Sequence, residues 1–445
     1  MLATVLGDDR CAVLSRDVDQ TAASVAAFSP GDGAAWQRMV ADWERIQPRV
    51  LQAVFRPFPP ARPLTGLLHD LGLGDSLRLV RQALLPARRL GDERFAGAGA
   101  PSLLAGCALH ADLPPDGAGS GLYGWLLAML GQSHGFPVPV GGAGRLADAL
   151  AARLRARGGS IRVSAPVDRV LVRDATATGV RLASGEQITA RRAVLADVAA
   201  PLLYQQLIGP DLLPERFVAD LADFEWDTPT LKVDWALSSP IPWTAPGART
   251  AGTVHVGADL DRLTVYAGEL ARRRVPTDPF LLLGQMITTD PTRSPDGTES
   301  AWGYTHLPID VTLSAEQIDR HVALVEATVE RHAPGFGSLI LARRVQSPAQ
   351  LQGTEPNLVH GAINGGTAQL HQQLVLRPTP GLGGAITPID RLYLAGSSAH
   401  PGGGVHGGPG ANAAHAAVAR SGALGVLTHP ATRALLTRIN GPRPR

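Results

Sequence analysis

The chain has 445 residues, of which 44% are hydrophobic and 18% are charged, and its formal net charge is +2. A chain of this length is expected to fold into two or three globular domains. So small a net charge gives no basic field of the kind that binds nucleic acid, and no nucleic-acid partner is expected. Lys232 is the only lysine, which leaves little scope for Schiff-base chemistry.

The cysteine and targeting signals are weak. Cys11 and Cys107 lie far apart in the sequence, so neither a disulfide framework nor a dithiol redox centre is indicated. The first residues lack the basic segment and apolar run of a signal peptide. No uncharged apolar run approaches the ~20 residues of a membrane-spanning helix. The expected location is therefore the cytoplasm.

Residues 1–135 have the pattern of a mainly helical substrate or cap region. The sequence Ser29-Pro30-Gly31-Asp32 is typical of a helix start, with a serine cap and a proline in the first turn. Apolar residues then recur at helical spacing, which predicts a stripe of core packing. These residues are Trp36, Met39, Val40, Trp43, Ile46 and Val50. Further short helices are expected at 76–85 and 122–130.

A different pattern extends from residue 136 to residue 200. Leu146, Leu150 and Leu154 line one face of a predicted helix that ends at Gly158-Gly159. The predicted strands that follow lie at 161–163, 167–172, 180–182, 188–190 and 193–195. This order indicates a segment of a nucleotide-binding α/β domain that carries a small antiparallel flap.

Residues 201–356 read as strands with a covering helix. A half-buried strand is indicated where apolar residues alternate with polar ones. The alternating residues are Leu231, Val233, Trp235 and Leu237. Ser314 and Gln317 form a capping box at the start of a helix with an apolar stripe. The segment therefore predicts an antiparallel sheet covered by a helix, suited to a substrate domain.

The most informative stretch spans residues 391–427. A short apolar strand, Leu392-Tyr393-Leu394, enters a glycine loop at 402–410, and an alanine-rich helix follows. Pro409 suits the first helical turn because its missing N–H is not needed there. The free N–H groups and the positive end of the helix dipole point back at the glycines, so the bound group should be anionic or electron-rich. A nucleotide or flavin cofactor is the first expectation.

Two glycine segments match the dinucleotide fingerprint G-x-G-x-x-G or its alanine variant, at 402–407 and 142–147. A true fingerprint follows a strand directly and is followed by an acid about 20 residues later. No acid occurs after Asp390, and the segment before Gly142 is a poor strand. Neither match is a complete fingerprint, and Gly142 is interpreted as part of a structural turn.

Hydrolase and metal chemistry are also disfavoured for this stretch. The sequence His406-Gly407-Gly408 can build an oxyanion hole, but the nucleophile, acid and histidine would have to follow it, and no acid does. His400, His406 and His415 fit no common zinc spacing. No metal is therefore expected.

The stretch from Leu392 to Asn412 resembles the carboxyl-terminal flavin motif of the phytoene desaturase-like, carotenoid-type FAD oxidoreductases. Two further segments are similar to that family. They are Pro139-Val140-Gly141-Gly142 through Val167 to Asp197, and residues 357–379 with Ile363-Asn364-Gly365-Gly366 and Leu370-His371-Gln372-Gln373. With the helix that starts at Ser29-Pro30, the resemblance covers essentially the whole chain.

The resemblance implies an α/β fold with an α+β substrate part. A Rossmann-like FAD-binding domain would comprise residues 136–200 and 357–430. A substrate domain, built of an antiparallel sheet and helices, would comprise residues 201–356 with the helical region 1–135. Residues 431–445 would form a tail.

The resemblance also implies an FAD site. Val167 would hold the adenine through its backbone, and Gly396 and Ser397 would lie by the ribityl chain and diphosphate. Backbone N–H groups of Val405 and His406 would point at the flavin pyrimidine edge. The implied cofactor-binding residues are Val167, Gly396, Ser397, Gly404, Val405, His406, Gly407 and Gly408. The implied residues of the substrate cavity are His371, Gln373 and Arg377, and no catalytic side chain is required because the flavin carries the chemistry.

The chain departs from the family pattern at its start. Family members open with a strand, a G-x-G-x-x-G loop, a helix and a second strand, a unit of ~30 residues. Residues 1–28 show no such unit. The Rossmann-like domain is therefore expected to be N-terminally incomplete, without the main ligands of the diphosphate and ribose.

The expected function is hydride transfer between FAD and a C–C bond of an apolar, isoprenoid- or carotenoid-like substrate. Two alternatives stay open. One is a truncated homologue that no longer binds FAD and acts as a binding or interaction protein. The other is a flavin-dependent isomerase or saturase. The sequence also leaves peripheral membrane contact and the oligomeric state open.

Overall fold

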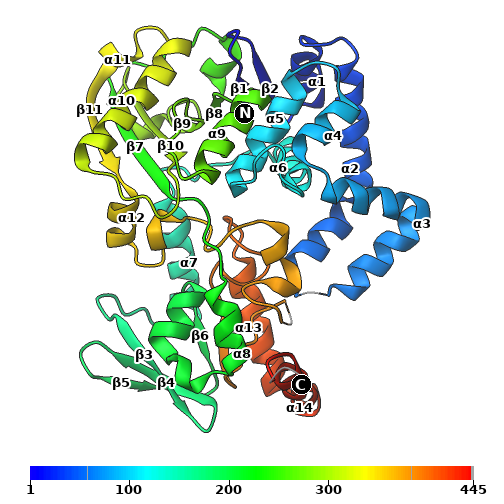
Figure 1. Ribbon diagram of the computed structural model, residues 1–445, viewed down its shortest axis with the longest axis vertical. Helices are drawn as coiled ribbons and strands as arrows, with labels where there is room; N and C mark the ends of the chain where they lie inside the picture. The colour runs from blue at the N-terminus through cyan, green and yellow to red at the C-terminus, as the bar shows by residue number, and fades with distance from the viewer. Residues whose placement is uncertain (58, 382, 442–445) are drawn as a thin grey trace. The chain divides into compact units, whose positions relative to one another are not determined.

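The computed structural model describes residues 1–57, 59–381 and 383–441 (Figure 1). The chain forms two compact units, each built from segments that are far apart in the sequence. The first unit consists of Met1–Ile46, Gly74–Ile161 and Thr228–Thr354. The second unit consists of Gln47–Leu73, Arg162–Asp227 and Glu355–Arg445, of which the last four residues lie outside the described part.

The first unit is organised around a seven-stranded sheet of order β11-β7-β10-β9-β8-β1-β2. Its strands are β1 (Leu2–Val5), β2 (Cys11–Leu14), β7 (Thr230–Leu237), β8 (Thr253–Val256), β9 (Leu281–Gln285), β10 (Glu299–His306) and β11 (Ile340–Gln346). All neighbours pair antiparallel except β1 and β8, which are parallel. The predicted substrate sheet is thus present and is extended by the two first strands of the chain.

Residues 1–135 are mainly helical, as predicted, but the two strands β1 and β2 at their start were not predicted. Each has only four residues, and all four residues of β1 are buried. A strand this short and buried on both faces shows no alternation of apolar and polar residues. The helical prediction holds for the segment that follows. Its helices are α1 (Val18–Ala26), α2 (Asp32–Phe55), α3 (Ala61–Leu84), α4 (Ala87–Arg94), α5 (Gly99–Ala108) and α6 (Ser120–His134).

Helix α2 begins at Asp32, three residues after the predicted serine cap. The Asp32 carboxylate is buried and accepts hydrogen bonds from the backbone N–H groups of Ala96 and Gly97, at 2.8 and 2.9 Å. It therefore anchors the loop before α5. The predicted stripe is confirmed, since Trp36 and Trp43 have no exposed surface. Their indole N–H groups donate to Gln132 and Ser133 of α6.

Helix α10 (Ala315–His332) covers one face of the sheet, as the capping box predicted. Ser314 accepts from the Gln317 N–H, and the Gln317 side chain accepts from the Ser314 N–H. Val322, Val325 and Val329 of α10 are buried in one core with the alternating residues of β7. The opposite face is partly covered by α5 and by α9 (Leu260–Ala271), which share a second core with β9.

The second unit contains a three-stranded antiparallel flap and a two-stranded parallel sheet. The flap is formed by β3 (Val167–Arg173), β4 (Thr176–Leu182) and β5 (Gln187–Thr189), as predicted, and the parallel pair by β6 (Val194–Ala196) and β12 (Leu392–Leu394). The helices α8 (Glu215–Ala222), α13 (Gly408–Ser421) and α14 (Ala423–Ile439) accompany these strands. Helix α14 continues past residue 430, where a tail was expected to begin.

The predicted strand at 161–163 is not formed. Val163 is 82% exposed, and a strand is stable only when neighbouring strands accept and donate its backbone hydrogen bonds. The predicted boundaries also differ from the two units in three places. Residues 47–73, predicted to belong to the cap region, lie in the second unit. Helix α7 (Gly144–Ala156) lies in the first unit, and residues 201–227 lie in the second.

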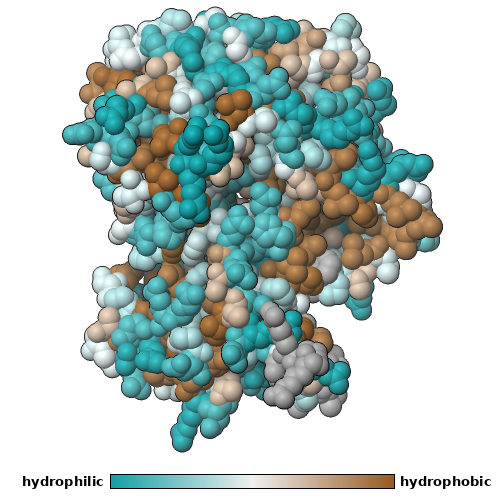
Figure 2. Space-filling model, in the orientation of Figure 1, coloured by the Kyte–Doolittle hydropathy of each residue, from teal (hydrophilic) through white to brown (hydrophobic). Residues whose placement is uncertain are grey.

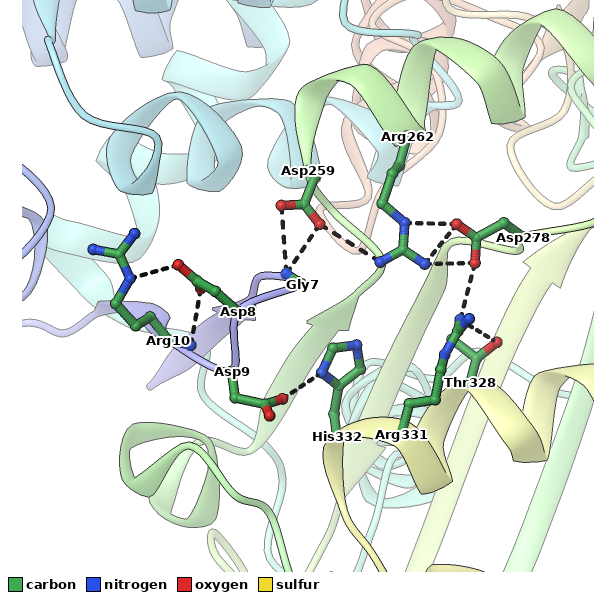
Figure 3. Close-up of polar contacts among 10 residues, drawn as sticks. All are labelled: Gly7, Asp8, Asp9, Arg10, Asp259, Arg262, Asp278, Thr328, Arg331 and His332. Atoms are coloured by element: carbon green, nitrogen blue, oxygen red, sulfur yellow. Dashed lines mark hydrogen bonds and ion pairs between the residues drawn. The ribbon is translucent and has the colours of Figure 1, made fainter.

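A polar network ties the turn between β1 and β2 to the first unit (Figure 3). Asp259 accepts from the Gly7 N–H, and Asp9 contacts Nδ1 of His332 at 2.8 Å. At its centre, the Asp278 carboxylate binds both Arg262 and Arg331. Burial opposes ionisation of Asp278, but the hydrogen bonds from the two arginines outweigh it and lower the pKa.

We expect Asp278→Asn to reduce the free energy of unfolding by about 1 kcal/mol at pH 7, a value kept small because solvent screens this network. The folded-state pKa of Asp278 lies below its ordinary value of 3.8. Its contribution is therefore present above pH 3.8 and is lost as the pH falls through the folded-state pKa. Urea unfolding at several pH values measures the difference. Asp296→Asn, in an exposed turn, is the control and should change little.

Candidate functional site

The glycine motif, by which we mean residues 396–410, follows strand β12 in the second unit. All three residues of β12 are buried, and the strand continues its parallel pairing with β6 through the Ala395 N–H and the Ala196 carbonyl. At Gly396 a Cβ atom would lie 2.9 Å from the Val198 carbonyl oxygen. Only glycine fits there, because any side chain would force the two strand ends apart.

The loop after β12 is held in left-handed glycine conformations. Gly402, Gly404 and Gly407 have φ of 107°, 138° and 63°. Val405 between them is 92% exposed. The His406 N–H donates to the Gly404 carbonyl, and His406 Nδ1 accepts from the Gly408 N–H at 3.0 Å. Burial lowers the pKa of His406, which favours the neutral ring that this contact requires.

Helix α13 begins at Gly408, directly after this loop. The N-cap residue is Gly407, which has no side chain, but the first N–H of the helix, that of Gly408, donates to His406 Nδ1. A Cβ at Gly407 would meet no atom within 4 Å. The first turn of an α-helix carries unsatisfied N–H groups and a partial positive charge. The loop and helix therefore form an open, positively polarised cradle for an electron-rich or anionic group.

The predicted donors at this cradle differ from one another. Within the described part of the chain the Val405 N–H has no protein acceptor, so it can point at a ligand as expected. The His406 N–H already donates to the Gly404 carbonyl oxygen, at 3.0 Å. The cradle therefore offers Val405 and the first turn of α13, and His406 serves to shape it.

A second loop, residues 363–367, lies against the glycine motif. A Cβ at Gly365 would be 2.1 Å from Ser397 Oγ, and a Cβ at Gly403 would be 2.9 Å from the Asn364 carbonyl oxygen. Ser398, which is fully buried, donates to the Gly365 carbonyl at 2.8 Å. The position of the glycine motif thus depends on this loop.

Two buried charged side chains fix the 363–367 loop. The Asp227 carboxylate accepts from the N–H groups of Ile363, Asn364 and Gly366, at 2.7, 2.7 and 2.8 Å. The Arg377 guanidinium donates to backbone carbonyls of the same loop and of the glycine motif. These carbonyls belong to Asn364, Gly365, Gly366, Thr367 and Ser397. Asp227 and Arg377 are each 2% exposed.

The three residues expected at the substrate cavity have other partners in the structure. His371 is exposed and contacts Glu225 at 2.8 Å. The buried Gln373 side chain donates to the Thr367 carbonyl. Arg377 lines a cavity of only about 30 Å³ beside the loops that it holds. A substrate role for them stays a prediction, as does adenine binding by Val167, which begins the flap at β3.

A larger cleft, of about 670 Å³, lies within the first unit. Its walls are mainly apolar and come from the segment before α7, from β7, β10 and β11, and from the segment after β9. They include Val138, Ala143, Ala236, Met286, Trp302 and Ala342. Protein clefts for small organic ligands commonly have 300–1,000 Å³ and apolar walls.

Comparison with known proteins identifies the family of this chain. A family model described as flavin containing amine oxidoreductase matches residues 12–411, which include segments of both units. This chain belongs to that family. The flavin cofactor and the α/β fold predicted from the sequence are thereby confirmed.

Individual relatives of the flavin amine oxidoreductase family are distant. The chain is 30% identical over 355 residues to mouse pyridine nucleotide-disulfide oxidoreductase domain-containing protein 2, a match covering 74% of this chain and 60% of that protein. It is 25% identical over 404 residues to the neurosporene-forming phytoene desaturase of Rhodobacter capsulatus, covering 86% of this chain and 71% of that one. The phytoene desaturase-like relationship is therefore confirmed.

A solved structure shows the shared fold. A triple mutant of putrescine oxidase, from a redesign of cofactor binding, superposes with a TM-score of 0.55 at 14% identity. The match covers 94% of this chain and 81% of that one. At this identity the likeness concerns the fold alone.

The fit of FAD to the family's site can be tested on this chain. The open glycine cradle and the positive end of the α13 dipole suit the isoalloxazine end of the cofactor. For the diphosphate end, the sheet of β6 and β12 has only two strands among the described residues, so no second unit of strand, glycine loop and helix joins the one formed by β12 and α13. Within the described chain no group of three His, Cys, Asp or Glu side chains could hold a metal.

Sequence reasoning missed that Asp227 and Arg377 fix the 363–367 loop. Asp227 lies 136 residues before Ile363, so no local pattern connects them. The cleft in the first unit was missed for the same reason, because its walls come from five segments that are separate in the sequence.

Proposed function

We propose that this chain is part of an FAD-dependent oxidoreductase that transfers a hydride between the flavin and a C–C bond of an apolar substrate. The observation that carries the proposal is the open glycine cradle at the start of α13 in a member of a flavin-containing family. FAD, when bound, supplies the hydride chemistry. The curated phytoene desaturase relatives favour an isoprenoid- or carotenoid-like substrate.

In this proposal the residues of the chain bind the flavin and the substrate and orient them. The glycine loop and the first turn of α13 hold the electron-rich ring, and the helix dipole favours negative charge there by roughly 0.3–1 kcal/mol. Asp227 and Arg377 hold the loop that supports the cradle. The apolar cleft in the first unit is the proposed substrate site, because its walls exclude water from an apolar molecule.

A second candidate function is a binding or interaction protein without flavin. It is favoured by the two-stranded sheet of β6 and β12, which offers no diphosphate cradle among the described residues. The chain spans 60% of the length of its mouse relative. Because the match covers only part of that relative, the oxidoreductase activity of the whole protein is itself a proposal.

Titration of the purified chain with FAD separates the two candidates. We expect flavin uptake, visible as an absorbance near the flavin band that is retained after gel filtration. Gly407→Val should weaken uptake roughly five- to thirtyfold, because a side chain in the left-handed conformation costs about 1–2 kcal/mol. Gly185→Val is the matched control, since Gly185 also has positive φ and open space but lies in the flap turn. A colourless chain that takes up no FAD would refute the oxidoreductase proposal for this chain.

An apolar substrate raises the question of membrane contact. In the described part of the chain, no helix combines the length and the apolar character that crossing a bilayer requires. Helix α3 nevertheless exposes Leu77, Val80 and Leu84 at helical spacing, by 61%, 57% and 55%. Figure 2 shows brown, apolar surface over this helix. We include peripheral membrane docking through these residues in the proposal, with a cytoplasmic location.

A further inference from the structure

Charged side chains line the cleft in the first unit, and a purely apolar substrate would form no polar contact with them. Residues of β7, β10 and β11 line the cleft. These three strands are neighbours in the sheet (Figure 1), and the register places one residue of each strand side by side. Arg344 of β11 is opposite Asp234 of β7, which is opposite Trp302 of β10. These side chains share a face because residues directly opposite in register point the same way.

The acidic groups of the cleft are already engaged. Asp234 forms an ion pair with Lys232, two positions along the same strand. Asp290 accepts hydrogen bonds from the N–H of Gly141 at 2.7 Å and from the hydroxyl of Thr292 at 2.7 Å. Both carboxylates therefore have partners other than a directly bonded arginine. The hydrogen bonds from Thr292 and Gly141 are the largest causes that lower the pKa of Asp290, and the charge of Arg293 adds to them.

The basic groups of the cleft are not all engaged. Three arginines line it, and Arg343 is paired with Glu326 at 2.7 Å. Arg344 and Arg293 have no carboxylate within ion-pair distance among the described residues. Arg293 ends a short helical turn, Pro291–Arg293. The cleft thus combines apolar walls with two arginines that lie outside ion-pair distance of a carboxylate among the described residues. These arginines favour an anion and repel an ammonium group.

We propose that this cleft binds a substrate with a long apolar body and a single carboxylate, which Arg293 and Arg344 receive. The inference rests on the proposed function in taking the cleft as the substrate site. It narrows the substrate class, because a neutral hydrocarbon would leave both arginines without a partner. An amine, the substrate type that the family description names, would meet like charge.

Affinity and selection come from different parts of the cleft. Both arginines are exposed, so each contact with a carboxylate is screened and weak. The apolar walls supply most of the affinity, and the arginines select the head group. Two such contacts together should favour a carboxylate over an alcohol of the same chain length by about tenfold.

Three probes of equal chain length test the proposal: dodecanoate, dodecan-1-ol and dodecylamine. Their binding to the purified chain is measured by titration calorimetry below the concentrations at which they aggregate. Dodecanoate should bind about tenfold more tightly than the alcohol, and the amine should bind more weakly than the alcohol. Quenching of tryptophan fluorescence provides a second readout, since Trp302 lines the cleft.

Charge-removing variants locate the carboxylate. Arg344→Gln and Arg293→Gln should each weaken dodecanoate binding about threefold, and together about tenfold, with dodecanol binding unchanged. Arg320→Gln is the matched control, because Arg320 is exposed on α10 and does not line the cleft. Both positions are on the surface, so the variants should fold and melt as the parent does.

The outcomes that overturn the proposal are equal affinity for dodecanoate and dodecylamine, unchanged dodecanoate binding in the double variant, or no binding of any probe. The measurement requires no flavin. A chain that binds dodecanoate in this pattern but takes up no FAD would therefore overturn the proposed function and leave the selectivity of the cleft standing.

Discussion

Replacing Arg377 by methionine is expected to reduce the free energy of unfolding by about 3–5 kcal/mol, the typical cost of removing one partner from a buried charged contact. Arg377 donates to five backbone carbonyls that belong to two different loops. Methionine keeps the apolar stem and leaves these carbonyls buried without their donor. Urea unfolding monitored by circular dichroism measures the loss.

Two further variants serve as controls for Arg377→Met. Arg173→Met removes an exposed arginine at the end of β3 in the same unit and should change stability by less than about 0.5 kcal/mol. Arg377→Lys keeps the charge but not the planar fork of donors, so it should recover only part of the loss. A loss below about 1 kcal/mol for Arg377→Met would show that water replaces the guanidinium and that the loops hold themselves in place.

The second large effect is expected for Asp227→Asn, at about 2–4 kcal/mol. The carboxylate accepts three backbone N–H groups, and hydrogen bonds to a charged acceptor contribute about 1.5–3 kcal/mol each. Asparagine has almost the same shape, but it places an amide donor against at least one of these N–H groups. FAD uptake should fall together with stability, because the 363–367 loop supports Ser397 and the glycine cradle.

Asp223→Asn is the matched control for this variant, since Asp223 is exposed four positions earlier in the same unit. It should leave both unfolding and flavin uptake unchanged. Asp227 and Arg377 both bond the 363–367 loop. The losses of unfolding free energy in the two single variants should therefore not add in the double variant. Additive losses, or full FAD uptake in Asp227→Asn, would contradict the role assigned to this loop.

Together the two residues explain why a glycine-rich cradle keeps a single shape. Glycines at 402, 404 and 407 allow the left-handed turns, but the same freedom makes an isolated loop costly to order. The ordering is supplied from outside the motif. The Asp227 carboxylate accepts from N–H groups of the 363–367 loop, and the Arg377 guanidinium donates to its carbonyls. The backbone of that loop therefore has few alternative conformations.

Local sequence signals were sufficient for the regular elements with strong periodicity. The alternation in β7 and the capping box of α10 each concern residues within a few positions of one another, and both are confirmed. The same holds for the strand, glycine loop and helix of the flavin motif. These features depend on backbone preferences and on the face of an element that is buried, which the chain specifies locally.

Short or unsupported elements were not predictable in this way. Strands β1 and β2 have four residues each and are recognised only by their neighbours in the sheet. The segment 161–163 has a strand-like pattern but forms no strand, since no described neighbour pairs with it. Strand formation is a property of the pair, and a single segment does not determine it.

The sequence by itself therefore determined the class of this protein, its flavin motif and most of its periodic helices and strands, because each of these depends on residues close together in the chain. The tertiary structure alone decided what holds the 363–367 loop and which side chains line the cleft. Asp227 and Arg377 bond backbone groups far from them in the sequence, and the fold places Arg293 and Arg344 in one cleft. The physical reason is that hydrogen bonding and charge act over a few ångströms in space, whatever the separation in sequence.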